Sequence, residues 1–285
     1  MTTALELSRR PALADTAITV LDRLPFPAAD GSSIDGSRTV RADYADAAYA
    51  QLCREAQAVW RGECPPSHPL AGLGADGRYS QSGLLQTGET DYLQRAYAAV
   101  AADGSCEWLH DAADVRRVLG TGGSLGTSGG YVNWRSGWAD AEAAMRFLRA
   151  ATEASGRVAF VTATVASLLA DGPAVAGVRL ADGAELRAAL TVVAAGAWSP
   201  TLVPELCGRS VATGQAVAYL RLPPDEWAAV ACMPVAFNLS PGAPPPPAPP
   251  RSRRAAIGGQ RRPDSRADEE AGRQACTPPH STGAS

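Results

Sequence analysis

An uncharged apolar stretch at residues 190–194 leads into a turn of small residues at 195–197. The stretch contains two valines, and such a run is typical of a strand buried on both faces of a parallel sheet. The small side chains of the turn let a ligand approach the backbone, and Ser199-Pro200 suits the start of a helix. The pattern predicts a strand, a turn and a helix around a phosphate or cofactor edge, although plain sheet packing would produce the same pattern.

The N-terminal segment has helical periodicity over residues 2–10 and a short apolar strand over residues 17–22, which ends at Asp22. A helix, a strand and a final acid form the second part of a βαβ unit. In dinucleotide-binding units a strand and a glycine-rich turn precede the helix, and the acid holds the ribose hydroxyls. Asp22 occupies the place of that acid, whereas the preceding strand and glycines are not present in this sequence.

Apolar spacing predicts further helices in the first half of the chain. Residues 46–61 place Tyr49, Leu52, Ala56 and Trp60 on one stripe, the pattern of a packed helix. Further helices are expected over 90–100 and 111–119, with strand elements between 77 and 88. A helix that begins after residue 130 and runs to about residue 155 would bury Ala141, Met145, Leu148 and Ala151.

Short alternating segments follow at residues 157–161, 164–169, 175–180 and 185–193, with a turn signal at Asp182-Gly183. They predict a small β-meander that returns to the buried strand at 190–194. The glycine-rich segment 120–130 lacks the Gly-Lys-Ser/Thr ending of a phosphate loop, so we expect a surface connector there.

Composition limits the class of protein. The chain has 285 residues, of which 46% are hydrophobic and 19% charged, as in a globular enzyme of one large or two intimate domains. A net charge of −3 gives no sign of a nucleic-acid surface, and the apolar runs are shorter than the ~20 residues of a membrane span. The cysteines and histidines lack the spacing of metal ligands, so no metal site is expected. No leader or other targeting signal is visible, and we expect an intracellular protein, cytoplasmic or peroxisomal.

A loop of small residues at 30–44 carries two arginines, Arg38 and Arg41. Two permanently charged guanidinium groups can face a carboxylate substrate, a cofactor phosphate or a reduced flavin. They could equally pair with Asp35 and Asp43, and the spacing alone does not decide between these alternatives.

Four stretches together resemble a known family: SSIDGSRTVRADYAD, GYVNWRSGWADAEAAMRFL, LADGAELRAALTVVAAGAWSPTLV and ATGQAVAYLRL. They are similar, in order, to FAD-dependent amine oxidases of the D-amino-acid-oxidase superfamily, particularly the fungal sarcosine-oxidase and fructosyl-amino-acid-oxidase group. The resemblance covers about residues 2–240. It implies that the meander is the insertion that many flavoproteins carry within their FAD-binding domain.

The resemblance also implies which residues bind FAD. Asp22 matches the acid that binds the adenosine ribose, Val165 matches a backbone contact to the adenine, and Ser37 matches the loop against the flavin. The full set of matching positions is Asp22, Arg23, Ser37, Arg38, Val165, Ala195, Gly196 and Trp198.

The implied reaction is oxidation of the C–N bond of a secondary amine or N-substituted amino acid. Hydride passes to the flavin, the imine product hydrolyses, and oxygen reoxidises the flavin to give hydrogen peroxide. Arg38 and Arg41 are the candidates that face the flavin or the substrate; the catalytic residues themselves are not identified. The expected partners are a small amine and oxygen, without nucleic acid or membrane, and the protein is expected to be a monomer.

The expected fold class is α/β, with a Rossmann-like parallel sheet that carries a β-meander insertion and an α+β substrate domain, both incomplete. Residues 1–76 and 157–206 would form part of the FAD-binding domain, and residues 77–156 and 207–241 part of the substrate domain. A sheet should join residues 17–22 to residues 190–194.

Both ends depart from the family pattern. The glycine turn that should cradle the pyrophosphate does not precede residue 2, and the lysine, cysteine and glycine-rich turn expected near the flavin do not follow residue 240. Residues 242–285 are rich in proline and arginine and are expected to be a disordered tail. Either this tail binds an SH3- or WW-like partner, or the chain is a fragment of a longer oxidase with weak FAD binding. The alternative function is therefore that of a non-catalytic interaction protein.

Overall fold

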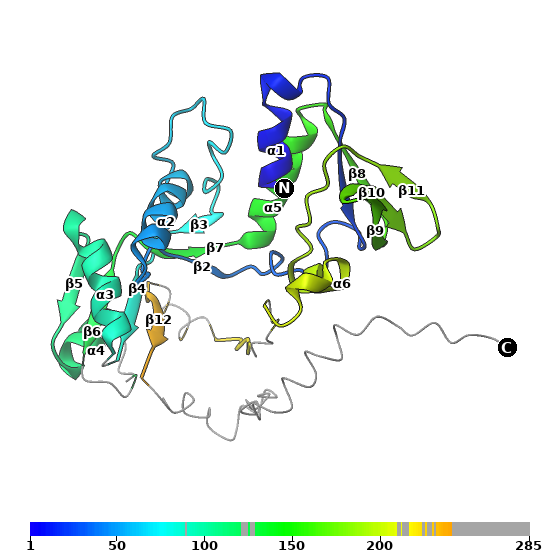
Figure 1. The fold of residues 1–285 in the computed structure, drawn as a ribbon. Coiled ribbons are helices and arrows are strands. Elements are labelled where there is room, and N and C mark those ends of the chain that lie inside the picture. The colour runs from blue at the N-terminus through cyan, green and yellow to red at the C-terminus, as the bar shows by residue number, and fades with distance from the viewer. Residues whose placement is uncertain are drawn as a thin grey trace. The chain divides into compact units, whose positions relative to one another are not determined.

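The computed structural model describes residues 1–88, 90–120, 125, 129–209, 212, 217–223, 226, 230 and 232–240 (Figure 1). The chain divides into two compact units, which are described separately. The first unit comprises residues 1–20, 24–161 and 222–248, and the second comprises residues 21–23, 162–221 and 249–285.

The first unit mixes helices with short strands. Its helices are α1 (Thr2–Ser8), α2 (Ala47–Trp60), α3 (Asp91–Val100), α4 (Ala112–Leu119) and α5 (Ala141–Glu153), with short 3₁₀ helices at Pro11–Leu13 and Ala101–Asp103. Its strands are β2 (Arg38–Val40), β3 (Tyr79–Ser80), β4 (Leu84–Thr87), β5 (Cys106–Leu109), β6 (Gly130–Asn133), β7 (Gly137–Ala139) and β12 (Val235–Asn238).

Side-chain caps fix where the helices of the first unit begin. The carboxylate of Asp46 accepts hydrogen bonds from two backbone N–H groups at the start of α2, and Asp111 does the same for α4. Asp140 caps α5, and the hydroxyl of Thr90 caps α3. Each cap satisfies N–H groups that have no partner within the helix. The helices predicted over 46–61, 90–100 and 111–119 are thereby confirmed.

A four-stranded sheet in the order β12-β4-β6-β5 forms the centre of the first unit. Strand β4 is parallel to β12 and antiparallel to β6, which is antiparallel to β5. Because alternate residues of β6 face opposite sides, Val132 packs with α4 while Tyr131 packs with α3. Figure 1 shows α3 and α4 against these strands. A second sheet has the order β2-β7-β3.

Helices α1 and α5 pack side by side through a third cluster, which contains Leu5, Ala144 and Leu148 (Figure 1). The expected face of α5 is largely confirmed, since Met145 and Ala151 are partly buried against the same cluster. The segment before α5 differs from the prediction: it forms strands β6 and β7 before the helix begins at Ala141.

The predicted apolar stripe of α2 is wrong. Tyr49 and Leu52 are 63% and 62% exposed, whereas Ala50 and Gln57 are the buried residues of the helix. A glutamine replaces the expected apolar contact because its side-chain Nε2 donates a hydrogen bond of 3.1 Å to the hydroxyl of Ser136. A buried amide of this kind is tolerated when hydrogen-bonded, and apolar spacing does not reveal it.

The second unit contains the predicted meander. Strands β9 (Val165–Asp171), β10 (Ala174–Leu180) and β11 (Glu185–Arg187) form an antiparallel sheet in the order β11-β10-β9, with the expected turn at Asp182-Gly183. A 3₁₀ helix (Gly196–Trp198), helix α6 (Ser199–Leu202) and a second 3₁₀ helix (Pro204–Leu206) follow. Strands β1 (Ile18–Asp22) and β8 (Val158–Thr162) pair with each other as a two-stranded sheet, and the first unit contains most residues of both strands.

The strand predicted over residues 190–194 is wrong, and so is its pairing with residues 17–22. Strand β11 ends at Arg187, and residues 190–194 are extended without a ladder to any strand that the structure describes. Leu190 and Val192 are 74% and 57% exposed. An apolar run becomes a strand only when a neighbouring strand supplies hydrogen-bond partners, and among the described residues β1 pairs with β8 instead.

The turn itself forms, with a different start to its helix. A 3₁₀ turn at Gly196–Trp198 comes first, and Trp198 rather than Ser199 is the N-cap of α6. The glycine-rich segment 120–130 and the tail 242–285 lie wholly or largely outside the described residues, so those predictions are not tested. The domain boundaries also stay predictions. Within the described ranges, no helix has the length and apolar character needed to cross a bilayer.

Candidate functional site

The loop of the first unit that contains Ser37 and Arg38 is held by Asp35. One carboxylate oxygen of Asp35 accepts a 3.2 Å hydrogen bond from the backbone N–H of Ser37, and the other lies 3.6 Å from Nη2 of Arg38. Arg38 begins β2 and its side chain is 47% exposed. Of the alternatives that the spacing left open, the structure shows Arg38 paired with Asp35, and the half-exposed guanidinium still presents charge to solvent.

Arg41 is positioned by a different set of contacts. Its Nη1 donates a 2.8 Å hydrogen bond to the backbone carbonyl of Asp43, not to the carboxylate. Its guanidinium carbon lies 4.3 Å from the ring centre of Tyr44 and 5.4 Å from that of Phe237. Within the described ranges no ion pair joins Arg41 to the Asp43 carboxylate, so this alternative is not the one observed, and the guanidinium lies near two aromatic rings.

The carboxylate of Asp43 is fully buried in a network of hydrogen bonds. Oδ2 accepts a 2.7 Å bond from the hydroxyl of Ser136, and both oxygens accept from Nδ2 of Asn133, at 3.1 and 3.2 Å. Burial raises the pKa of Asp43 above its usual value, against the hydrogen bonds of Ser136 and Asn133, which lower it. This network ties the loop that carries Arg41 to strand β6 and the turn after it.

A second buried pair lies next to this network. Nε2 of Gln86 donates a 2.8 Å hydrogen bond to the hydroxyl oxygen of Tyr131, while Oε1 of Gln86 is buried with no partner among the described residues. Burial raises the pKa of Tyr131 and, to about 12, the pKa of Cys106. Both groups therefore stay neutral at physiological pH.

The second unit contains the other predicted FAD-binding residues. The guanidinium of Arg23 lies 4.4 Å from the ring centre of Trp198, and Trp198 is 41% exposed. Asp22 ends β1, and its backbone carbonyl accepts a 2.8 Å hydrogen bond from Ala163 N–H. Val165 begins β9 opposite Leu180.

The small-residue turn of this unit starts at Ala195 and has Gly196 at a φ of +54°. A Cβ added at Gly196 would meet nothing within 4 Å, so this face of the turn is open. The hydroxyl of Thr191, just before the turn, is buried without a partner among the described residues. The turn therefore has open space on this face.

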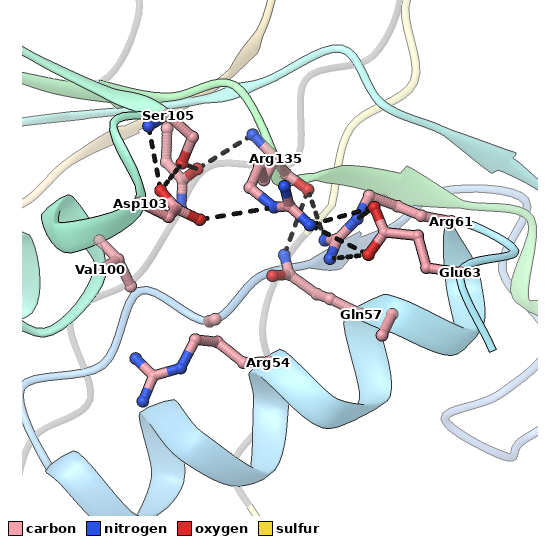
Figure 2. Close-up of a pocket in the computed structure, with 11 residues that line it drawn as sticks. Arg54, Gln57, Arg61, Glu63, Val100, Asp103, Ser105 and Arg135 are labelled. Atoms are coloured by element: carbon pink, nitrogen blue, oxygen red, sulfur yellow. Dashed lines mark hydrogen bonds and ion pairs between the residues drawn. The ribbon is translucent and has the colours of Figure 1, made fainter.

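The first unit also contains a cavity of about 260 Å³ that the sequence did not predict (Figure 2). Charged residues of the cavity come from α2, the segment after it, the 3₁₀ helix at Ala101–Asp103 and the turn after β6. The lining residues are Ala42, Arg54, Gln57, Ala58, Arg61, Glu63, Val100, Asp103, Ser105, Asn133 and Arg135.

The sequence did not predict the Asp43 network either. The segment GYVNWRSGW was recognised only as part of a resemblance, yet it supplies Tyr131, Asn133 and Ser136. The sequence did contain a signal for this network: small polar residues lie within and just after a strand that is otherwise apolar. Buried polar side chains require hydrogen-bond partners, so such residues indicate a buried network.

An acid that ends a strand, a small-residue turn and an antiparallel meander are the features that the resemblance to FAD-dependent oxidoreductases leads us to expect. A family model described as FAD dependent oxidoreductase, DAO, matches residues 1–277, and the chain belongs to this family. The family is FAD-dependent, as the sequence predicted.

Two curated relatives are amino acid oxidases. Amino acid oxidase fsqB of Aspergillus fumigatus is 33% identical over 271 residues, which cover 78% of this chain and 51% of that protein. Amino acid oxidase imqH of Aspergillus flavus is 31% identical over 271 residues, and the match covers 78% of this chain and 54% of that protein. The chain thus spans about half the length of these relatives.

Solved structures show the same fold. A modified fructosyl peptide oxidase from Aspergillus nidulans has a TM-score of 0.70 at 26% identity, with 83% of this chain and 56% of that chain covered. The fructosyl amine:oxygen oxidoreductase amadoriase I from Aspergillus fumigatus has a TM-score of 0.65 at 23% identity. The match covers 84% of this chain and 55% of that chain. The predicted fold class is confirmed by this likeness.

The described residues of the second unit fit the part of FAD that the resemblance assigns to them. A carboxylate at a strand end accepts hydrogen bonds from ribose hydroxyls, and Asp22 supplies one. The open face at Gly196 lets a ligand approach the backbone. The individual roles of the predicted site residues stay predictions.

Proposed function

We propose that this chain takes part in oxidising the C–N bond of an N-substituted amino acid, such as sarcosine or a fructosyl amino acid. Family membership supports an FAD-dependent oxidoreductase, and the relatives include oxidases of amino acids and of fructosyl amines. The observation that carries the proposal is Asp22 at the end of β1, next to the stacked Arg23 and Trp198. Bound FAD would accept the hydride and pass electrons to oxygen, giving hydrogen peroxide.

The residues of this chain would bind and orient rather than react. Asp22 would accept hydrogen bonds from the adenosine ribose, and the backbone of Val165 would contact the adenine. Ser37 and Arg38 would contact the flavin, where the half-exposed guanidinium supplies positive charge. Arg41 is proposed to face the substrate carboxylate, because its guanidinium lacks a described ion pair and is positioned by the Asp43 carbonyl and two aromatic rings.

The test is to purify the full chain, measure flavin absorbance, and assay peroxide with sarcosine and with a fructosyl amino acid. Because the glycine turn for the pyrophosphate is not present in this sequence, we expect weak flavin binding in the wild type and still weaker binding in Asp22→Asn, which keeps the shape but loses the charge. Asp171→Asn is the matched control, because Asp171 also ends a strand of the second unit and is exposed. A folded chain that takes up no flavin would contradict the proposal and favour a non-catalytic interaction protein.

A further inference from the structure

The cavity of the first unit has an unbalanced set of charges. Arg54, Arg61 and Arg135 line it together with the two carboxylates of Glu63 and Asp103, which leaves one positive charge. None of the residues assigned to FAD or substrate lines this cavity. The proposed reaction therefore does not explain the positive charge of this cavity.

The carboxylates of the cavity are already saturated (Figure 2). Glu63 accepts two 2.8 Å hydrogen bonds from Arg61 and two 3.0 Å bonds from Nη2 of Arg135. Oδ1 of Asp103 accepts from Ser105 N–H and hydroxyl, and its Oδ2 lies 3.5 Å from Nε of Arg135. The hydrogen bonds from Arg61 lower the pKa of Glu63, so the cluster is fully ionised at neutral pH.

The guanidinium groups, in contrast, retain donors. Nη1 of Arg54 donates to the carbonyl of Ala99 at 2.6 Å and Nη2 donates to the amide oxygen of Gln51 at 2.7 Å, so both of its acceptors are uncharged. Nε of Arg54 and Nη1 of Arg135 have no acceptor among the described residues. A cavity whose carboxylates already have partners and whose guanidinium groups retain donors is suited to a ligand that accepts hydrogen bonds.

We propose that this cavity binds a small oxyanion, a phosphate or carboxylate group held by Arg54 and Arg135. Guanidinium groups bind both of these anions through paired N–H donors. The saturated carboxylates of Glu63 and Asp103 keep the Arg135 side chain in place, and Arg54 contributes the charge that no described carboxylate balances. A volume of about 260 Å³ admits the remainder of a small molecule as well as the anionic group.

The experiment titrates the full chain by calorimetry at low ionic strength with sodium phosphate and, separately, sodium acetate, with sodium chloride as the ionic control. We expect saturable binding of one phosphate or one acetate. Arg54→Gln should weaken that binding about tenfold or more, because a charge-assisted hydrogen bond is lost. Arg95→Gln is the matched control, since Arg95 is an exposed arginine of neighbouring α3 that does not line the cavity, and it should change binding less than about twofold.

A second measurement uses the wild-type chain alone and so does not depend on how a variant folds. Phenylglyoxal modifies arginines, and mass spectrometry after digestion gives the extent at each site. The anion that saturates in the titration should protect Arg54 and leave Arg95 unprotected, and comparison of the two anions identifies the preferred group. Absence of saturable binding, or equal effects at Arg54 and Arg95, would overturn the proposal. Neither readout requires FAD, so failure of the proposed function would leave this test intact.

Discussion

The hydroxyl of Ser136 donates a 2.7 Å hydrogen bond to Oδ2 of Asp43, a carboxylate with no exposed surface. The two residues lie 93 positions apart in the sequence. The bond therefore fixes the loop with Arg41 to the turn that follows β6.

Ser136→Ala should destabilise the first unit by about 1–3 kcal/mol, because a buried carboxylate loses one of its donors. Urea unfolding monitored by circular dichroism measures the change. Ser33→Ala is the control: this serine is exposed, and its replacement should stay within about 0.5 kcal/mol. Equal effects of the two substitutions would mean that the Asp43 network contributes nothing to stability.

Asp43 should also impose a pH dependence. Burial raises its folded pKa above 3.8, so the folded state binds the proton more tightly than the unfolded state. Its contribution to stability therefore falls as pH rises from about 3.8 through the raised folded pKa, and it levels off above that. Asp43→Asn removes this contribution, so the stability of the wild type relative to the variant should decline with rising pH across that window.

The measurement is a series of urea unfolding curves for both proteins at matched pH values. Glu63 and Asp103 have lowered pKa values and contribute in the opposite direction, but they are common to both proteins and cancel in the difference. A pH-independent difference would contradict the effect of burial on Asp43.

Gly130→Ala should disrupt the central sheet. A Cβ at this position would overlap the backbone carbonyl of Gln86 on the paired strand β4, and the strands would have to move apart. Overpacking of this kind costs about 1–3 kcal/mol. Gly36→Ala is the comparison, since a Cβ there meets nothing within 4 Å and its φ is not positive. Thermal unfolding should separate the two variants, and similar melting temperatures would refute the close approach of β4 and β6.

Arg157→Ala should loosen the segment between α1 and β1. The guanidinium donates to three backbone carbonyls, those of Ser8 at 2.6 Å, Thr16 at 3.3 Å and Leu13. Loss of these bonds should cost about 2 kcal/mol, and lysine should restore only part, because an ammonium cannot span three carbonyls as a planar fork does. Hydrogen exchange over residues 8–16 is the measurement; full recovery with Arg157→Lys would contradict the geometric argument. Arg9→Ala, an exposed neighbour, is the control.

The sequence predicted elements wherever local signals and packing agreed. Asp46 and Asp111 cap their helices, and the Asp182-Gly183 turn joins two strands of the meander, so these elements lie close to their predicted positions. The prediction of the buried face of α2 was wrong because it considered only the spacing of apolar side chains. One buried residue of this helix is Gln57, whose amide is hydrogen-bonded.

The site was predictable to a smaller extent. Asp22 could be selected because it ends a predicted strand, and Arg38 because it lies in a loop of small residues. Arg38 pairs with Asp35, three residues away. Arg41 could not be assigned, because its ring contact with Phe237 joins residues that are remote in sequence. The same holds for the cavity, where Arg135 meets Glu63 from 72 positions away.

The extended apolar segment at residues 190–194 has a consequence for handling the protein in solution. Its side chains alternate between exposed and half-buried, and the exposed set includes Leu190 and Val192. A backbone of this kind, without ladder partners among the described residues, is a template onto which an identical chain can add, and aggregation begins at such edges. Lysine at Leu190 or Val192 would act as a gatekeeper, raising the concentration at which light scattering first appears while leaving the circular dichroism spectrum unchanged.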